Sequence, residues 1–230
     1  MKSLTFSDGF STSFKLAMSQ FWSVLGAILL WIITLWIPYI NVGTTIGLIR
    51  LQIQLGRGEK IIAAEIFDAE NRAAMGKMFL LWSFMTTGII IGTIFLIVPG
   101  IVLWYAWFLS SMLILDKKLD PIQAMSKSYD LTYGYKWVVF FITLAIQIIY
   151  GLVSSLFDPT GPITRYVIPN RFLEEYYDMY YEYIVYGEHA GLFISLSLVS
   201  LAVIIVGGVW LMAAYGYMYS MLSGNKKSKK

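Results

Sequence analysis

The chain has 230 residues, of which 58% are hydrophobic and only 13% are charged, whereas soluble domains carry about a quarter charged residues. This composition excludes a disordered chain and argues against an ordinary soluble enzyme. Cysteine is absent and His189 is the single histidine, which excludes disulfides, thiolate metal sites and multi-histidine metal sites; the net charge is only +3. The sequence therefore predicts an integral membrane protein.

Four long windows contain no Asp, Glu, Lys or Arg: 16–49, 78–115, 137–157 and 190–225. A transmembrane helix needs about 20 apolar residues. Each of the first two windows holds two spans, because Pro38 and Pro99 near their middles favour turns. The predicted fold is all-α, with six transmembrane helices at about 16–37, 38–56, 78–98, 99–115, 137–157 and 190–222.

The basic residues predict the orientation of these spans. Fifteen of the 17 Lys and Arg residues lie at the two termini, in the links 50–77 and 116–136, or near the ends of these segments. Only Arg165 and Arg171 fall in 158–188, which carries six acidic residues. Because basic loops stay in the cytoplasm, we expect a multi-pass protein of the cytoplasmic membrane with both termini cytoplasmic and an extracytoplasmic 158–188 insertion.

The spans pair into three helical hairpins, 6–57, 61–117 and 121–226, within a single transmembrane domain, 1–230. Each hairpin opens with a semi-polar stretch and ends at a similar distance past its turn, which suggests a threefold repeat. In the third stretch, Ile122, Met125, Tyr129 and Thr132/Tyr133 share one helical face. Two interpretations remain for these linkers: amphipathic helices at the cytoplasmic interface, or elbows that pack under the bundle.

One stretch resembles a known family signature. Val98-Pro99-Gly100-Ile101 forms the turn, the following aromatic span ends at Asp116, and an Ala124-x-x-x-Ser128 helix leads to Gly134-x-Lys136-Trp137. This pattern resembles the family of six-helix bacterial inner-membrane proteins that includes YciC and the membrane domain of some glycerophosphodiester phosphodiesterases. The resemblance implies a fold and a compartment, and no reaction.

Three polar residues inside the predicted spans form a candidate intramembrane polar site. Arg50 lies twelve residues past Pro38, about 18 Å from the outer turn, and Gln54 shares its face. Gln147 lies in the middle of the fifth span. Intramembrane charges are functional candidates. Snorkelling of Arg50 to the headgroups and a structural pairing are the alternatives.

Two Gly-x-x-x-Gly patterns occur within the spans, at Gly43–Gly47 and at Gly88–Gly92. Such patterns let two helix backbones approach closely. Packing within the monomer and homodimerisation are both compatible with them.

The outer segment is rich in tyrosine. A helix that begins near Asn170 and runs to about 186 would carry Tyr176, Tyr177, Tyr180, Tyr181 and Tyr183 among acidic residues. Tyrosine offers a large contact area and is favoured at binding surfaces. We expect a partner-docking helix; an amphipathic helix that rests on the outer leaflet is the alternative.

The sequence contains no catalytic constellation, phosphate-binding loop or metal-ligand motif. We therefore expect a non-enzymatic protein without a cofactor or a bound metal. It would act as an accessory or scaffold subunit that binds membrane lipids and a membrane-protein partner, and no nucleic acid. The alternative is a transporter or lipid-handling protein with a polar path near Arg50 and Gln147.

Overall fold

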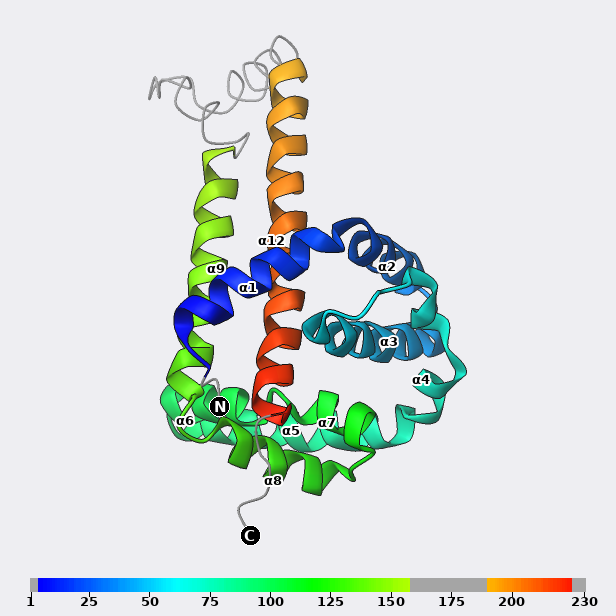
Figure 1. The fold of residues 1–230 in the computed structure, drawn as a ribbon, viewed down its shortest axis with the longest axis vertical. Helices are drawn as coiled ribbons and strands as arrows, with labels where there is room; N and C mark the ends of the chain where they lie inside the picture. Colours follow the sequence, from blue (N-terminus) through cyan, green and yellow to red (C-terminus); the bar gives the residue numbers. More distant parts are fainter. Residues whose placement is uncertain (1–3, 158–189, 225–230) are drawn as a thin grey trace, which may run out of the picture. The chain divides into compact units, whose positions relative to one another are not determined.

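The protein is helical throughout the part that the computed structural model describes, residues 4–157 and 190–224 (Figure 1). No strand occurs in these ranges. Four helical segments there are long and apolar enough to cross a membrane: Met75–Phe95, Ile97–Lys117, Lys136–Leu156 and Ile194–Gly224. Helices suit a membrane because each satisfies its backbone hydrogen bonds internally. At this level the predicted all-α class with several apolar helices is confirmed.

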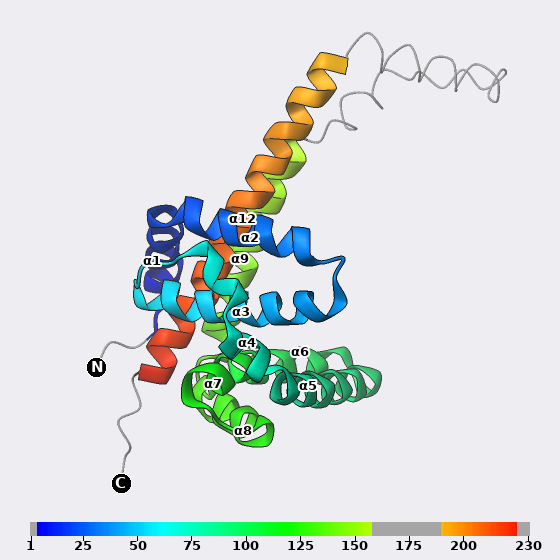
Figure 2. The same ribbon diagram turned by 90° about the vertical axis from the view of Figure 1, so that its right-hand side faces the viewer.

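The helices form hairpins that are joined by shorter elements. In chain order they are α1 (Phe6–Ser19), α2 (Phe21–Thr34), α3 (Pro38–Arg57), the 3₁₀ helix η1 (Ala63–Phe67), α4 (Ala69–Ala73), α5 (Met75–Phe95), α6 (Ile97–Trp107), α7 (Ser110–Lys117), α8 (Pro121–Thr132), α9 (Lys136–Leu156) and α12 (Ala190–Gly224). In both views α2 lies beside α3, and α5 lies beside α6 (Figures 1 and 2).

The chain divides into two compact units, 1–146 with 209–230, and 147–208. In the described part of the second unit, a Cβ on Gly207 would lie 2.5 Å from the Tyr150 ring, so α9 and α12 approach closely there. The third predicted hairpin, 121–226, has residues in both units. The single domain 1–230 therefore stays a prediction, and the insertion 158–188 lies outside the described residues.

The first predicted span, 16–37, is wrong as one helix. The chain bends by 78° between α1 and α2, and α2 has only 14 residues. Gln20 holds this bend, because its amide donates to the Glu59 carbonyl at 2.6 Å and accepts from the Ile61 N–H at 2.7 Å. The side chain of Gln20 thus ties the bend to the segment that follows α3.

The two predicted turns occur close to their prolines. α2 ends at Thr34, and Pro38 is the first residue of α3, where its missing N–H costs nothing. In the second hairpin the chain turns at Leu96, which has an extended backbone, and Pro99 lies in the first turn of α6. The second turn is therefore about two residues earlier than the sequence suggested.

The semi-polar stretches that open the first and third hairpins form helices, α1 and α8. The stretch 61–77 is divided into η1, α4 and the start of α5. α8 forms as predicted, but it buries its small residues Ala124, Ser128 and Thr132, while Ile122 and Tyr133 are exposed. Small side chains allow closer approach, and the Ser128 hydroxyl donates to the Ala106 carbonyl at 2.7 Å. Of the predicted apolar face, Ile122 and Tyr133 are thus exposed and Thr132 is buried, and α8 packs mainly through its small residues.

The second helices of the three hairpins converge at their carboxyl ends. A Cβ on Gly56 of α3 would overlap the backbone of Gly216 in α12, and a Cβ on Gly216 would overlap the carbonyl of Gln52. Small residues allow two helices to approach this closely. α7 joins them through Asp116, whose carboxylate accepts hydrogen bonds from Arg57 of α3 and Tyr219 of α12.

Each linker packs on the second helix of the preceding hairpin. Ile66 of η1 lies against Gly47 of α3, and α8 packs on α6 and α7. α1 has the corresponding place on the last helix, since the Trp210 indole donates to the Ser13 hydroxyl at 3.0 Å and its ring lies 4.7 Å from that of Phe10. The first linker thus covers the last helix, in the way that each later linker covers the helix before it.

Both Gly-x-x-x-Gly patterns are used inside the chain. A Cβ on Gly47 would lie 2.5 Å from the Ile66 backbone, and a Cβ on Gly88 would lie 2.8 Å from the Trp107 ring. Gly92 approaches Leu103 of α6 in the same way, at 2.9 Å. Of the two interpretations, packing within the monomer is the one that the structure displays.

Candidate functional site

A charged cluster joins the three converging helices. Its members are Arg57, Asp116, Lys117 and Tyr219, and we call it the Asp116 cluster. Oδ1 of Asp116 accepts from Arg57 Nη2 at 2.6 Å, and Oδ2 accepts from the Tyr219 hydroxyl at 2.6 Å and from Lys117 Nζ at 3.2 Å. The Asp116 side chain is only 12% exposed, so these donors compensate for the desolvation of its charge.

The local sequence places these groups at helix ends. Gly58 ends α3 in the left-handed conformation with φ 72°, and Lys118 ends α7 in the same way. Basic residues are favoured in a last helical turn. The hydrogen bond to Asp116 raises the pKa of the Arg57 guanidinium above its ordinary value, while burial opposes this shift. Arg57 therefore stays charged at every physiological pH.

A cavity of about 400 Å³, open on the side where Thr86 and Trp104 are exposed, lies next to the Asp116 cluster. We call it the inner cavity. Aromatic and aliphatic side chains predominate in its wall, with a few hydroxyl and amide groups. The lining residues are Ile49, Gln52, Trp82, Met85, Thr86, Ile89, Trp104, Phe108, Ser111, Met112 and Tyr215. Small-molecule sites combine an apolar wall with a few polar groups in this way and measure about 300–1,000 Å³.

The inner cavity lies about one helical turn from the cluster on each converging helix. Gln52 precedes Arg57 by five residues, Ser111 precedes Asp116 by five, and Tyr215 precedes Tyr219 by four. At 1.5 Å per residue this is about 6–8 Å along each axis. The salt-bridged Asp116 cluster thus lies at the end of the cavity that is nearest the carboxyl ends of the helices.

A break between α6 and α7 contributes to the cavity. The helix is interrupted at Phe108 and Leu109, and Phe108 lines the cavity. The Ala106 carbonyl beside the break accepts from the Ser128 hydroxyl. Ser110 Oγ is one of two buried side-chain atoms in the described part of the chain without a hydrogen-bond partner. Sequence reasoning missed the break, because no proline or glycine occurs at 106–112.

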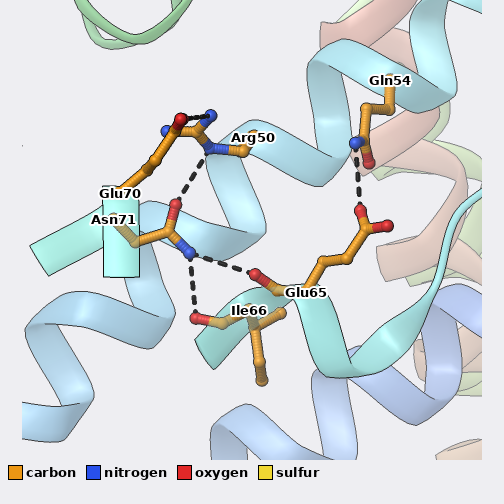
Figure 3. A network of polar contacts seen from close by, with 6 residues as sticks. All are labelled: Arg50, Gln54, Glu65, Ile66, Glu70 and Asn71. Atoms are coloured by element: carbon orange, nitrogen blue, oxygen red, sulfur yellow. Dashed lines mark hydrogen bonds and ion pairs between the residues drawn. The ribbon is translucent and has the colours of Figure 1, made fainter. Parts of the chain in front are cut away.

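The predicted polar site is only partly assembled. Arg50 Nη1 donates to Glu70 Oε2 at 2.7 Å, and Gln54 Nε2 donates to Glu65 Oε2 at 3.0 Å (Figure 3). Both side chains thus point toward the η1–α4 link, and neither lines the inner cavity. Gln147 is exposed on α9 and belongs to the second unit. A ligand path through Arg50, Gln54 and Gln147 remains a prediction.

Asn71 organises the contacts of Arg50 and is fully buried. Its Oδ1 accepts from Arg50 Nε at 3.0 Å, and its Nδ2 donates to the carbonyls of Glu65 and Ile66, both at 3.1 Å (Figure 3). Sequence reasoning did not select Asn71. The sequence did contain a signal. Asn71 is an amide in the link after α3, and this link must run back along the helix that carries Arg50.

We expect Asn71→Ala to lower the free energy of unfolding by about 2–3 kcal/mol, because it leaves buried polar groups unpaired. Thermal unfolding of the purified protein in detergent measures the loss. Glu70→Gln is the control: its side chain is 73% exposed, so its loss should cost under about 1 kcal/mol. Equal losses for both variants would contradict the role given to Asn71.

The remaining predicted features concern docking and metals. The candidate docking tyrosines Tyr176, Tyr177, Tyr180, Tyr181 and Tyr183 lie outside the described residues. Within residues 4–157 and 190–224, no group of three or more His, Cys, Asp or Glu side chains is placed to hold a metal ion. Comparison of the chain with protein-family models, with curated proteins and with solved structures gives no match, so the functional argument stands on the inner cavity and the Asp116 cluster.

Proposed function

We propose that the protein is a non-enzymatic, multi-pass protein of the cytoplasmic membrane that holds a lipid acyl chain in the inner cavity and serves as an accessory or scaffold subunit. The four apolar helices and the unequal distribution of Lys and Arg support the membrane location, with both termini cytoplasmic. Both termini lie on the same side of the membrane whether the chain has four spans or six, because each hairpin crosses the membrane twice.

The apolar wall of the inner cavity is the observation that carries the proposal. Trp82, Met85, Ile89, Trp104 and Phe108 would all contact an occupant. Such a wall suits a flexible hydrocarbon chain better than a polar solute, because burial of apolar surface is favourable whereas burial of an unpaired polar group is costly. The cavity lies among apolar helices, where acyl chains are the abundant occupants.

The polar groups nearby support a binding role more than a reaction. Asp116 is engaged by Arg57, Lys117 and Tyr219, and Arg50 is engaged by Glu70 and Asn71. Paired groups of this kind hold helices together. These pairings also leave less support for the alternative of a polar transport path, because Arg50 and Gln54 already bind the link.

The accessory role belongs to the same proposal. It rests on the lack of a catalytic constellation in the sequence and on the tyrosine-rich 158–188 insertion, which would dock a membrane-protein partner on the outer face. Capture of a stoichiometric partner by the full chain, and loss of that partner when 170–186 is deleted, would support this part of the proposal. Unchanged capture would contradict it.

Two neighbouring threonines test lipid binding. Thr86 lines the inner cavity, whereas its neighbour Thr87 on α5 is not one of the lining residues; both are exposed. We expect Thr86→Trp to fill the space and to lower the lipid-bound fraction in native mass spectrometry at least about tenfold, a loss of about 1.4 kcal/mol in binding free energy. Thr87→Trp should leave bound lipid unchanged. Retention of lipid by Thr86→Trp would contradict the proposal.

A further inference from the structure

We infer that the α2–α3 hairpin rests on the cytoplasmic leaflet of the membrane and does not cross it, with the exposed apolar face of α2 against the lipid. The inference goes beyond lipid binding in the inner cavity, and it rests on the proposed membrane location. It assigns four spans to the chain, in the two hairpins formed by α5 with α6–α7 and by α9 with α12.

The two ends of α3 are attached to the same side of the membrane. Near its start, a Cβ on Gly43 would lie 3.0 Å from Met75, the first residue of α5. At its end, Arg57 pairs with Asp116 near the end of α7. The spans 75–95 and 97–117 are joined at Leu96, so α5 begins on the side where α7 ends. The Lys77–Asp120 pair at 2.7 Å joins these ends directly.

Charged side chains of the following link lie beside α3 almost as far as the turn between α2 and α3. Asp68 and Arg72 line a small pocket with Ile40 and Gly43, and Ile40 is only two residues past Pro38. A charged side chain at the centre of a membrane helix costs about 2.5–3.5 kcal/mol. If the hairpin crossed the bilayer, these charges would lie close to its outer half. At the cytoplasmic interface they remain in water and headgroups.

The helix lengths agree with a hairpin that does not cross. α2 has 14 residues, which span about 21 Å, whereas the hydrocarbon core is about 30 Å thick. α2 reaches the length of a span only together with α1, from which it is bent by 78°. α3 is not among the four helices that are long and apolar enough, and it carries Arg50, Gln52 and Gln54.

One face of α2 is apolar and exposed. Trp22 is 80% exposed and Trp36 just beyond the helix is 89% exposed, and Leu29 and Ile33 are exposed at helical spacing between them. The opposite face, with Val24 and Ala27, is buried. An apolar face of this size is covered by lipid when it lies against a membrane, and Trp is the side chain that membrane interfaces favour. The occupant that fits this face is therefore the leaflet itself.

The absence of native cysteine allows a direct test by single substitutions in the full chain. Ile37→Cys marks the α2–α3 turn, Val98→Cys marks the second hairpin turn, and Ser126→Cys marks exposed α8. A membrane-impermeant maleimide is applied to intact spheroplasts and to inside-out vesicles. From outside, we expect Val98→Cys to react and Ile37→Cys to react at least about tenfold less, because a whole hydrocarbon core separates the two turns.

The outcomes separate this inference from the proposed membrane location. Labelling of Ile37→Cys from outside to the same extent as Val98→Cys would overturn the inference alone. Failure of Val98→Cys to react from outside, or labelling of Ser126→Cys from outside, would overturn the proposed orientation and this inference with it.

A second measurement identifies what covers α2. Ile33→Cys is coupled to a fluorophore, and the protein is reconstituted in liposomes with nitroxide-labelled phospholipid. We expect the lipid to quench the fluorophore to about half or less, since an interfacial helix lies only about 5–10 Å deep. Absence of quenching would overturn lipid contact and would point to a second copy or another protein on this face.

Discussion

Replacing Gly216 by valine should unfold the junction of the three hairpins. The new side chain would overlap the Gln52 carbonyl of α3 and would lie within 3.0 Å of the Gly56 nitrogen. Because the obstructing atoms are backbone, no rotamer change relieves the overlap, and the helices must separate. We expect a loss of about 3 kcal/mol or more in the free energy of unfolding, measured by thermal unfolding in detergent, with a matching loss from Gly56→Val.

Gly208→Ala on the same helix is the matched control. A Cβ there would meet nothing within 4 Å, and alanine is favoured over glycine in a helix by about 1 kcal/mol. The Tm of this variant should be unchanged or higher. If Gly216→Val is as stable as Gly208→Ala, then α3 and α12 do not meet at these glycines.

Asp116→Ala should cost nearly as much, because it removes the shared acceptor of Arg57, Lys117 and Tyr219. Breaking a fully buried charge pair costs about 3–5 kcal/mol. The side chain of Arg57 is 35% exposed, so water can solvate the guanidinium that loses its partner. We therefore expect a smaller loss in the free energy of unfolding, about 2–3 kcal/mol. Tyr219→Phe removes only one hydrogen bond to the carboxylate and should cost about 1–2 kcal/mol. Thermal unfolding of the three proteins gives both differences.

Asp120→Ala is the control for the loss of an acidic group. Asp120 pairs with Lys77 at 2.7 Å, about as short as the pair between Asp116 and Arg57, but the side chains of Lys77 and Asp120 are 48% and 64% exposed. Such surface pairs contribute about 0–1 kcal/mol. If Asp120→Ala destabilised the protein as much as Asp116→Ala, the special position of the Asp116 cluster would be refuted.

Sequence patterns predicted much of the helical framework. Charge-free windows located α5, α6–α7, α9 and α12, because a long apolar stretch has few stable alternatives to a buried helix. Pro38 and Pro99 located the turns to within about two residues, since proline disfavours the helix before it. The pair Asp120-Pro121 has the sequence pattern of a helix start, and α8 begins at Pro121.

The bend at Gln20 and the packed face of α8 were not predictable in this way. Gln20 lies between two apolar runs, and it bends the chain only because Glu59 and Ile61 offer it backbone partners from 39–41 residues away. α8 buries Ser128 because the Ala106 carbonyl needs a donor. Both features depend on long-range contacts, which periodicity does not contain.

The candidate site shows the same division. The sequence pointed to Arg50 because a charge inside a predicted span is costly. Its pairing with Glu70 could not be predicted, because it depends on how the link folds back along α3. Arg57 and Asp116 lie at the ends of the second helices of the first two hairpins, so the predicted repeat could have suggested their pairing. The inner cavity could not have been predicted from the sequence. It forms where α3, α5, α6–α7 and α12 meet, and Phe108 at the break between α6 and α7 is part of its wall.

Photolabelling from inside the bilayer tests the central claim most directly, namely that an acyl chain occupies the inner cavity. The protein is reconstituted with phospholipid that carries a diazirine on its acyl chain, irradiated, and mapped by peptide mass spectrometry. Phe108 lines the cavity at the break between α6 and α7 and is partly exposed, so an occupant of the cavity can contact it. We predict labelling at Phe108 that disappears in Thr86→Trp. Labelling confined to exposed residues such as Ile94 and Leu198, with none at Phe108, would contradict the account.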